Sequence, residues 1–269
     1  MGVTDSVNKG FTIAKSNFSL SFVLILLYLA YFGVNFALNT FSGLPKQPQD
    51  ASTLPPGELF RQMSVGMAIG LIGLIIQNYI QAGLVGHVGN TIRNGQQPLS
   101  VFFTSAKKFA LKLFAQALVI MGLILVVFLI AVILMGIIGA ASQPAGLIVG
   151  LPLMGIAIYL SLLLFYSSYI LVLENKGLLE SMKLSVGFVR RNLLSLLGLI
   201  LIFIVLFLIP LVLLGGFVVL IQGPLKGVAA IAVSVVAIPL FIFILAFYGI
   251  AVTGAVISFY LGRSSHSAA

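Results

Sequence analysis

The sequence predicts an all-α polytopic membrane protein with six transmembrane helices, arranged as three repeats of an amphipathic interfacial helix plus a transmembrane hairpin. Three observations lead to this prediction. Of the 269 residues, 61% are hydrophobic and only 7% are charged, against about 25% charged residues in an ordinary soluble domain. Six apolar runs reach the length of a bilayer-spanning helix, which is about 20 residues. Three basic segments with one shared pattern precede the first, third and fifth runs.

The apolar runs cover approximately residues 18–39, 63–86, 109–139, 145–173, 193–221 and 227–260. Continuous helix is the expected conformation, because the hydrocarbon core offers no hydrogen-bond partner for free backbone N–H and C=O groups. A β-barrel would need segments of alternating hydrophobicity, and the run from Leu199 to Ile209 does not alternate. We therefore expect one six-span membrane domain over residues 1–263 and a disordered tail over residues 264–269.

Lysine and arginine divide unequally between the two ends of these spans. Eleven lie on the side of the N-terminus, namely Lys9, Lys15, Arg93, Lys107, Lys108, Lys112, Lys176, Lys183, Arg190, Arg191 and Arg263, and three lie on the other, namely Lys46, Arg61 and Lys226. Because the excess of basic residues marks cytoplasmic loops, we expect a protein of the cytoplasmic membrane with both termini in the cytoplasm. Attraction to anionic headgroups accounts for the net charge of +9, so no nucleic-acid partner is predicted.

The three basic segments align without gaps at offsets of 92 and 175 residues. Four positions at spacings i, i+4, i+7 and i+11 share one helix face. They are apolar in every copy: Val7, Phe11, Ala14 and Phe18; Leu99, Phe103, Ala106 and Ala110; Met182, Val186, Val189 and Leu193. The predicted repeat units are about residues 4–90, 96–175 and 178–263. Basic residues on the polar face of an interfacial helix bind anionic lipid, which predicts lipid contacts at Lys15, Lys107, Lys108, Arg190 and Arg191.

The second span carries a face of small and polar residues, formed by Gly66, Gly70, Gly73, Gln77 and Gln81 at helical spacing. Glycines let a neighbouring helix approach closely and amides bond across the contact, so this face predicts a packing seam. The alternative is a polar patch that lines a cavity for a headgroup or solute. Polar residues of three spans make up the candidate ligand-binding set: Gln77, Asn78, Tyr79, Gln81, Tyr166, Tyr169 and Tyr248.

No catalytic residue, metal site or cofactor is predicted. The chain has no cysteine, and its two histidines, His87 and His266, lie far apart in the sequence, whereas a metal site needs several ligands. His87 is expected at the membrane interface. No Asp or Glu falls well inside a span, which argues against an ion-coupled pump and against an intramembrane acid–base enzyme.

The chain between the fourth and fifth spans follows a recognisable order. A span ends after Tyr169, a turn runs from Glu174 to Gly177, and a helix with Ser185 near its middle leads to a basic pair and Asn192. This order resembles the membrane domain that precedes the catalytic domain of some glycerophosphodiester phosphodiesterases, and related six-span proteins of bacteria and archaea. The resemblance implies a six-span layout and transfers no catalytic residue or substrate.

These observations favour a non-enzymatic integral membrane protein that binds or organises lipid, or that serves as a scaffold for a protein partner or a second copy of itself. The alternative is a transporter or channel component for a small or lipid-like solute. A continuous polar cavity contacted by Gln77, Asn78, Gln81 and Tyr166 would favour transport. Dry packing around these residues, with lipid between the repeats, would favour the first function.

Overall fold

The computed structural model describes residues 1–41, 55–141, 143–222 and 228–264. Within these ranges the chain forms eight helices and no strand: α1 (Val3–Ser16), α2 (Phe18–Phe41), α3 (Pro56–Asn94), α4 (Ser100–Ala141), α5 (Gln143–Leu164), α6 (Ser167–Leu173), α7 (Leu178–Gln222) and α8 (Val228–Ser264). The predicted disordered tail lies outside the described residues except for Ser264, which ends α8.

The described residues include six helical segments that are long and apolar enough to cross a membrane: Phe18–Leu38, Pro56–Asn94, Ser100–Gly139, Ile148–Leu173, Leu178–Val212 and Leu240–Ser264. Large apolar side chains are exposed along these segments, with Leu26 67%, Phe36 74% and Ile148 70% exposed. Apolar surface of this extent is unstable in water and fits a lipid environment. The prediction of an all-helical chain with six helices long and apolar enough to span a membrane is confirmed for the described residues.

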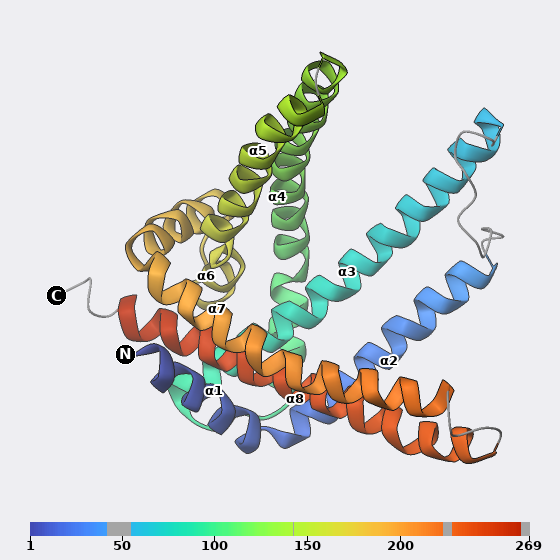
Figure 1. Cartoon of the computed structure of the whole chain (residues 1–269). Coiled ribbons are helices and arrows are strands. Elements are labelled where there is room, and N and C mark those ends of the chain that lie inside the picture. The colour runs from blue at the N-terminus through green and yellow to red at the C-terminus, as the bar shows by residue number, and fades with distance from the viewer. Residues whose placement is uncertain (42–54, 142, 223–227, 265–269) are drawn as a thin grey trace.

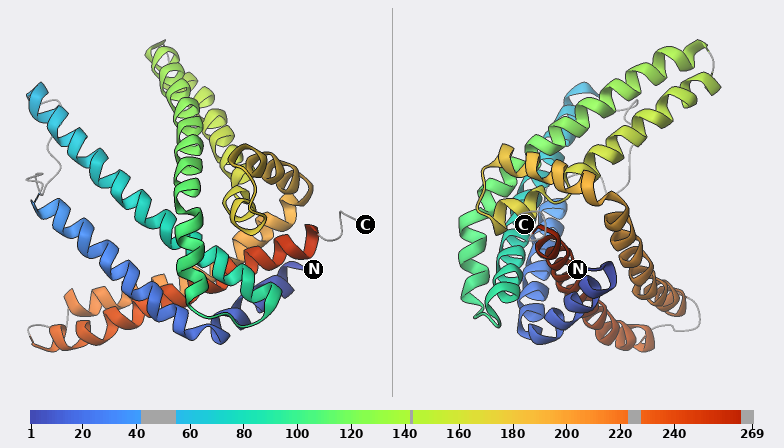
Figure 2. Two further views of the ribbon diagram at one scale, coloured as in Figure 1. Left: turned by 180° about the vertical axis from the view of Figure 1, so that it is seen from behind. Right: turned by 90° about the vertical axis from the view of Figure 1, so that its left-hand side faces the viewer.

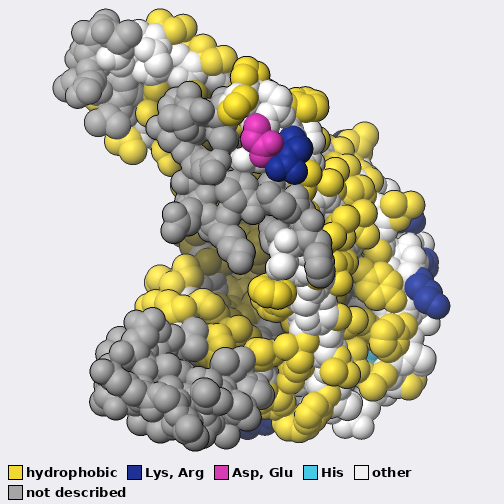
Figure 3. All heavy atoms as spheres, turned by 90° about the vertical axis from the view of Figure 1, so that its right-hand side faces the viewer, with side chains coloured by type: hydrophobic (Ala, Val, Ile, Leu, Met, Phe, Trp, Pro, Cys, Tyr) yellow, Lys and Arg dark blue, Asp and Glu magenta, His cyan; other side chains and the backbone are white. Residues whose placement is uncertain are grey.

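Three hairpins, α2–α3, α4–α5 and α7–α8, diverge from one end of the molecule, and the N-terminus and the end of α8 lie there (Figures 1 and 2). We call it the basal end. It consists of α1, α6 and the adjoining parts of the long helices, 80–94, 100–116, 178–203 and 246–264. Most of the buried apolar side chains belong to these segments. Away from the basal end the hairpins separate, and apolar side chains line the hollow between them (Figure 3).

The first basic segment, α1, packs antiparallel to the end of α8. A Cβ built at Gly262 would meet Met1, and a Cβ built at Gly10 would collide with the Ala251 carbonyl. Val7, Gly10 and Ala14 are buried in this contact. The apolar face that the sequence assigns to the membrane surface is thus covered largely by α8, although Phe18 at its end is exposed.

The other two basic segments also bury one face on a neighbouring hairpin. The start of α4 lies against α3, where Phe102 is the neighbour of Gly83 and Ser105 the neighbour of Gly86. The start of α7 packs against α5 and α6, and Ser185 Oγ donates a hydrogen bond of 2.7 Å to the Leu163 carbonyl. The segment of α4 is not a separate helix as expected, because it continues directly into its span, whereas the segment of α7 is set off from its span by the non-helical residue Asn192.

Two asparagines bend the chain where a basic segment joins its span. Asn17 follows α1 with φ −114° and ψ 41°, and Asn192 lies inside α7 with φ −123° and ψ 17°. Each Nδ2 donates to the carbonyl four residues earlier, Ile13 at 2.9 Å and Phe188 at 3.0 Å. Such side-chain bonds compete with the helical backbone ladder. The corresponding residue of α4 is Phe109, which has no amide, and α4 runs on without a break.

The predicted glycine seam on the second span is wrong at two of its positions. Among the described residues, a Cβ at Gly66 or Gly70 would meet no atom within 4 Å. Close helix approach occurs instead near the basal end, at Gly83, where a Cβ would meet the Phe102 ring at 2.7 Å, and at Gly10 in α1. The same residue type therefore supports packing only where another helix crosses.

Candidate functional site

The candidate polar residues of α3 do not face a shared cavity. Gln77 is exposed, while Tyr79 and Gln81 are half-buried. Asn78 is buried, and its Nδ2 donates 2.7 Å to the Leu74 carbonyl of its own helix. The Asn78 amide therefore has its partner within α3 and needs no ligand.

The three candidate tyrosines lie elsewhere. Tyr166 is fully buried at the junction of α5 and α6, stacks on Tyr260 with ring centroids 5.7 Å apart, and donates 3.4 Å to the Val256 carbonyl. Tyr169 packs beside it at 5.9 Å. Tyr248 of α8 donates to the Phe203 carbonyl of α7. These contacts make the tyrosines packing residues of helix junctions rather than parts of one ligand site.

Buried polar pairs join helices that are far apart in the sequence. His87 Nε2 lies 3.1 Å from Asn17 Oδ1, and both residues are buried. Because the Asn17 amide nitrogen already donates to Ile13, Oδ1 accepts and His87 carries its proton on Nε2. His87 is thus a buried packing residue and not the interfacial one expected. Gln116 Nε2 likewise donates 3.0 Å to Ser181 Oγ between α4 and α7.

The described residues form both apolar and polar cavities, and four of these bear on the candidate residues. Two are apolar: one of 330 Å³ between α7 and α8, lined by Phe203 and Tyr248 among others, and one of 430 Å³ between α4 and α5. Two are polar and lie at the basal end, with volumes of 410 and 490 Å³. Gln77, Asn78, Gln81 and Tyr166 line none of the four.

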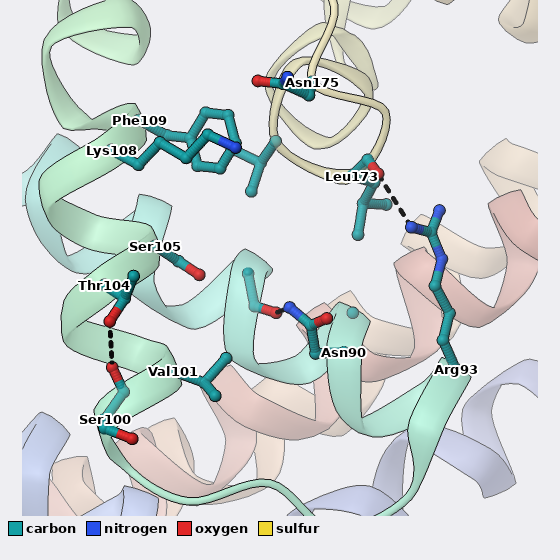
Figure 4. A pocket seen from close by; sticks show the side chains of 13 residues that line it. Asn90, Arg93, Ser100, Val101, Thr104, Ser105, Lys108, Phe109, Leu173 and Asn175 are labelled. Carbon is teal, nitrogen blue, oxygen red and sulfur yellow. Dashed lines mark hydrogen bonds between the residues drawn. The ribbon is translucent and has the colours of Figure 1, made fainter.

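The 410 Å³ cavity, which we call the basal pocket, lies between the end of α3, the start of α4 and the end of α6 (Figure 4). Its polar lining residues are Asn90, Arg93, Ser100, Thr104, Ser105, Lys108 and Asn175. Figure 4 shows Lys108 extending from α4 toward the α6 wall and Asn175 lying above the opening between the two helices. No carboxylate lines the basal pocket among the described residues.

The 490 Å³ cavity, the companion pocket, lies between the start of α7 and the end of α8. Its cations are Lys183, Arg191 and Arg263, and it also contains Glu180. Arg263 Nη1 donates 2.7 Å to Asn192 Oδ1, which holds the end of α8 against the bend of α7. Glu180 forms an ion pair of 2.6 Å with Lys176.

The basic residues predicted to contact lipid remain on the surface. Lys15, Lys107, Lys108, Arg190 and Arg191 are all exposed at the basal end. Only Lys108 and Arg191 also line a pocket. The candidate set from the sequence misses Arg93, Ser105 and Asn175, because the basal pocket forms only when the ends of α3 and α6 meet α4. The sequence feature that could have indicated this pocket is the basic residue Arg93 at the end of a predicted span.

No model of a protein family, no curated protein and no solved structure matches this chain. The candidate function therefore depends on the geometry of the chain itself.

Proposed function

We propose that this protein is a non-enzymatic integral membrane protein that binds anionic lipid at its basal end and holds lipid between its diverging hairpins. The observation that carries the proposal is the separation of charge. The exposed cations gather at the basal end, whereas the opposite end of the described hairpins carries one, Arg61, paired with Glu58 at 2.8 Å. Cationic surface beside span ends attracts anionic headgroups. The basal end then faces the cytoplasm, and the membrane is the cytoplasmic one.

The surroundings of the candidate polar residues support lipid binding over transport. Asn78 and Tyr166 bond to backbone carbonyls, and Gln77 lies on an exposed helix face. A solute pathway needs convergent polar groups around a water-accessible space. The hollow between the hairpins is instead lined by apolar side chains (Figure 3), which suits acyl chains.

Three structural repeats are part of this proposal, and burial supports them. At the offsets of 92 and 175 residues, four sets of equivalent positions are buried in all three units. They are Gly10, Phe102 and Ser185; Ala14, Ala106 and Val189; Ser21, Leu113 and Leu196; and Leu24, Gln116 and Leu199. Their spacing of i, i+4, i+11 and i+14 is that of one helix face.

The packing order also supports the repeats. The basic segment of the first unit packs on α8 of the third, that of the second on α3 of the first, and that of the third on α5 and α6 of the second. Head-to-tail contacts of one kind close into a ring when the rotation between units is regular. A ring of this kind gives the protein three lipid-facing gaps between hairpins. The resemblance to phosphodiesterase membrane domains fits such a non-catalytic role.

Loss of basal charge tests this function. The variant with Arg190→Gln and Arg191→Gln, purified in a mild neutral detergent, is expected to retain less anionic phospholipid than the wild type, by about half or more. The matched control is Arg61→Gln at the other end, whose exposed ion pair is worth about 0–1 kcal/mol. Phospholipid is quantified by phosphate assay and mass spectrometry. Equal anionic lipid in all three proteins would contradict the proposal.

A flux assay tests the competing function. Proteoliposomes with wild-type protein and with Gln77→Leu are expected to release a panel of trapped small solutes no faster than protein-free liposomes. Protein-dependent release that Gln77→Leu abolishes would replace the lipid-binding proposal with transport, because Gln77 lies on α3 away from the basal cations.

A further inference from the structure

The basal pocket differs from the surrounding basic surface because it is walled on three sides. α3 contributes one wall through Gly86, Gly89 and Arg93, α4 the second, and the end of α6 the third. Its volume of 410 Å³ falls within the range of small-molecule sites, about 300–1,000 Å³. We propose that the basal pocket binds one phosphate group, supplied by the headgroup of an anionic phospholipid. This inference rests on the proposed lipid-binding function and assigns it a specific site.

Two cations give the basal pocket its charge. Lys108 forms no ion pair among the described residues, and its Nζ lies 4.9 Å from the centre of the Phe109 ring. Arg93 Nη1 donates 3.0 Å to the Leu173 carbonyl, which leaves most of its five N–H groups without a hydrogen-bond partner among the described residues. Neither cation is paired with a carboxylate among the described residues that line the basal pocket, and a bound phosphate would accept charge-assisted hydrogen bonds from them.

Neutral donors complete the lining. Ser105 Oγ makes no hydrogen bond to the described residues, and Figure 4 shows it directed from α4 toward α3. Asn175 has a positive φ of 52°, which is uncommon for a residue other than glycine. In this conformation its side chain lies over the opening of the basal pocket. Hydroxyl and amide donors beside two cations are the groups that bind phosphate oxygens.

The depth of the basal pocket points to lipid rather than to a solute. Its walls come from the points where three candidate spans end or begin, at Asn94, Ser100 and Leu173. Headgroups of a bilayer lie at this level. Apolar side chains at Val101 and Val172 form part of the same lining, so the first methylene groups of an acyl chain find apolar contacts beside the phosphate.

The companion pocket repeats this construction. All six residues that α4 contributes to the basal pocket have counterparts 83 residues later, and all six counterparts line the companion pocket. Lys108 corresponds to Arg191, and Arg263 supplies a second cation from the end of a span, as Arg93 does. Two units thus place a cation pair at the same position. Lys183 adds a third cation to the companion pocket and Glu180 adds a carboxylate, so the two pockets carry the same formal charge. We therefore expect both pockets to bind phosphate.

Native mass spectrometry of the full chain in neutral detergent tests the assignment. The ligands are short-chain phosphatidylglycerol, short-chain phosphatidylcholine and inorganic phosphate. The variants are Lys108→Gln and Arg93→Gln, and the matched control is Lys9→Gln, an exposed cation of α1 that is not among the predicted lipid contacts and lines neither pocket. Wild type and control are expected to bind two phosphatidylglycerol molecules, one in each pocket, while each variant of the basal pocket weakens one of these two sites by about tenfold or more. Thermal unfolding midpoints equal to that of the wild type establish that the variants are folded.

Each outcome decides a separate point. Inorganic phosphate that displaces the lipid at millimolar concentration identifies a free phosphate source and overturns the lipid assignment, while binding of lipid alone supports it. Phosphatidylcholine bound as tightly as phosphatidylglycerol overturns selection by the two cations. Equal losses in Lys9→Gln and Lys108→Gln overturn the basal pocket but leave lipid binding by the basal surface intact. No phosphatidylglycerol on the wild type overturns both.

Discussion

Position 10 has no room for a side chain. A Cβ there would collide with the Ala251 carbonyl and lie 2.8 Å from the Ala255 backbone nitrogen, so α1 could accept Gly10→Ala only by moving away from α8. Overpacking costs about 1–3 kcal/mol, which exceeds the gain of about 1 kcal/mol that alanine brings to a helix. We predict a lower thermal unfolding midpoint for Gly10→Ala in detergent.

Gly70→Ala is the matched comparison, because a Cβ there meets no described atom within 4 Å. Its midpoint is expected to equal or exceed that of the wild type. A midpoint that falls as far as that of Gly10→Ala would mean that Gly70 packs against another molecule or an undescribed part of the chain.

The glycines of α3 show why the sequence predicts close packing at positions where the structure has none. Glycines at helical spacing mark a face that permits close approach, but the pattern does not identify the approaching helix. Gly70 shares the pattern and faces open space, whereas Gly83 and Gly86 meet α4. Whether a glycine is packed depends on which helix crosses it in the folded structure. That crossing in turn depends on the loops and on helices distant in the sequence.

At the scale of the helix, each of the bends at Asn17 and Asn192 is joined to a distant helix by one side-chain hydrogen bond, which is buried between Asn17 and His87 and partly buried between Asn192 and Arg263. Asn17→Leu leaves the His87 Nε2–H unpaired, and an unsatisfied buried group costs about 1–3 kcal/mol. Replacing both partners with apolar groups is nearly neutral. We predict that Asn17→Leu and His87→Leu each lower the unfolding midpoint, and that the double variant loses less than the sum of the two.

The control for this cycle is Asn94→Leu, at the exposed end of α3. It is expected to change stability by no more than about 0.5 kcal/mol and to show no coupling to His87→Leu. If the stability losses of Asn17→Leu and His87→Leu are additive, the hydrogen bond between the two side chains contributes nothing beyond the packing of each residue.

At the same scale, the pattern of hydrophobicity predicts the spans but does not predict the contacts between helices. The six runs predict the spans because lipid demands about 20 apolar residues from each helix. The basic segments reveal their apolar face but not what covers it, because the interior of a membrane protein and the bilayer are equally apolar. The structure covers that face with α8, α3 and α5–α6. The basal pocket was not predictable for this reason, since its walls come from α3, α4 and α6, which meet only in the folded structure.

At the scale of the whole molecule, the proposed function requires all three basic segments to lie on one side of the membrane. The chain has no cysteine, so single cysteines report their side without background. Lys15, Lys107 and Arg190 are exposed and occupy equivalent positions of the three segments. Gly57, at the start of α3, is exposed with no described atom within 4 Å of its Cβ position, and lies at the other end of the hairpins.

We predict that Lys15→Cys, Lys107→Cys and Arg190→Cys react with a membrane-impermeant maleimide only in inside-out vesicles, and Gly57→Cys only in right-side-out vesicles. α3 has 39 residues, and at about 1.5 Å per residue it is longer than the hydrocarbon core of about 30 Å, so Gly57 lies beyond the far side of the bilayer. Labelling of any one basic position from the same side as Gly57 would show that the three basic segments lie on different sides of the membrane. The ring of head-to-tail contacts would then be impossible in a bilayer, because α1, the start of α4 and the start of α7 pack together only if they share one face of the membrane.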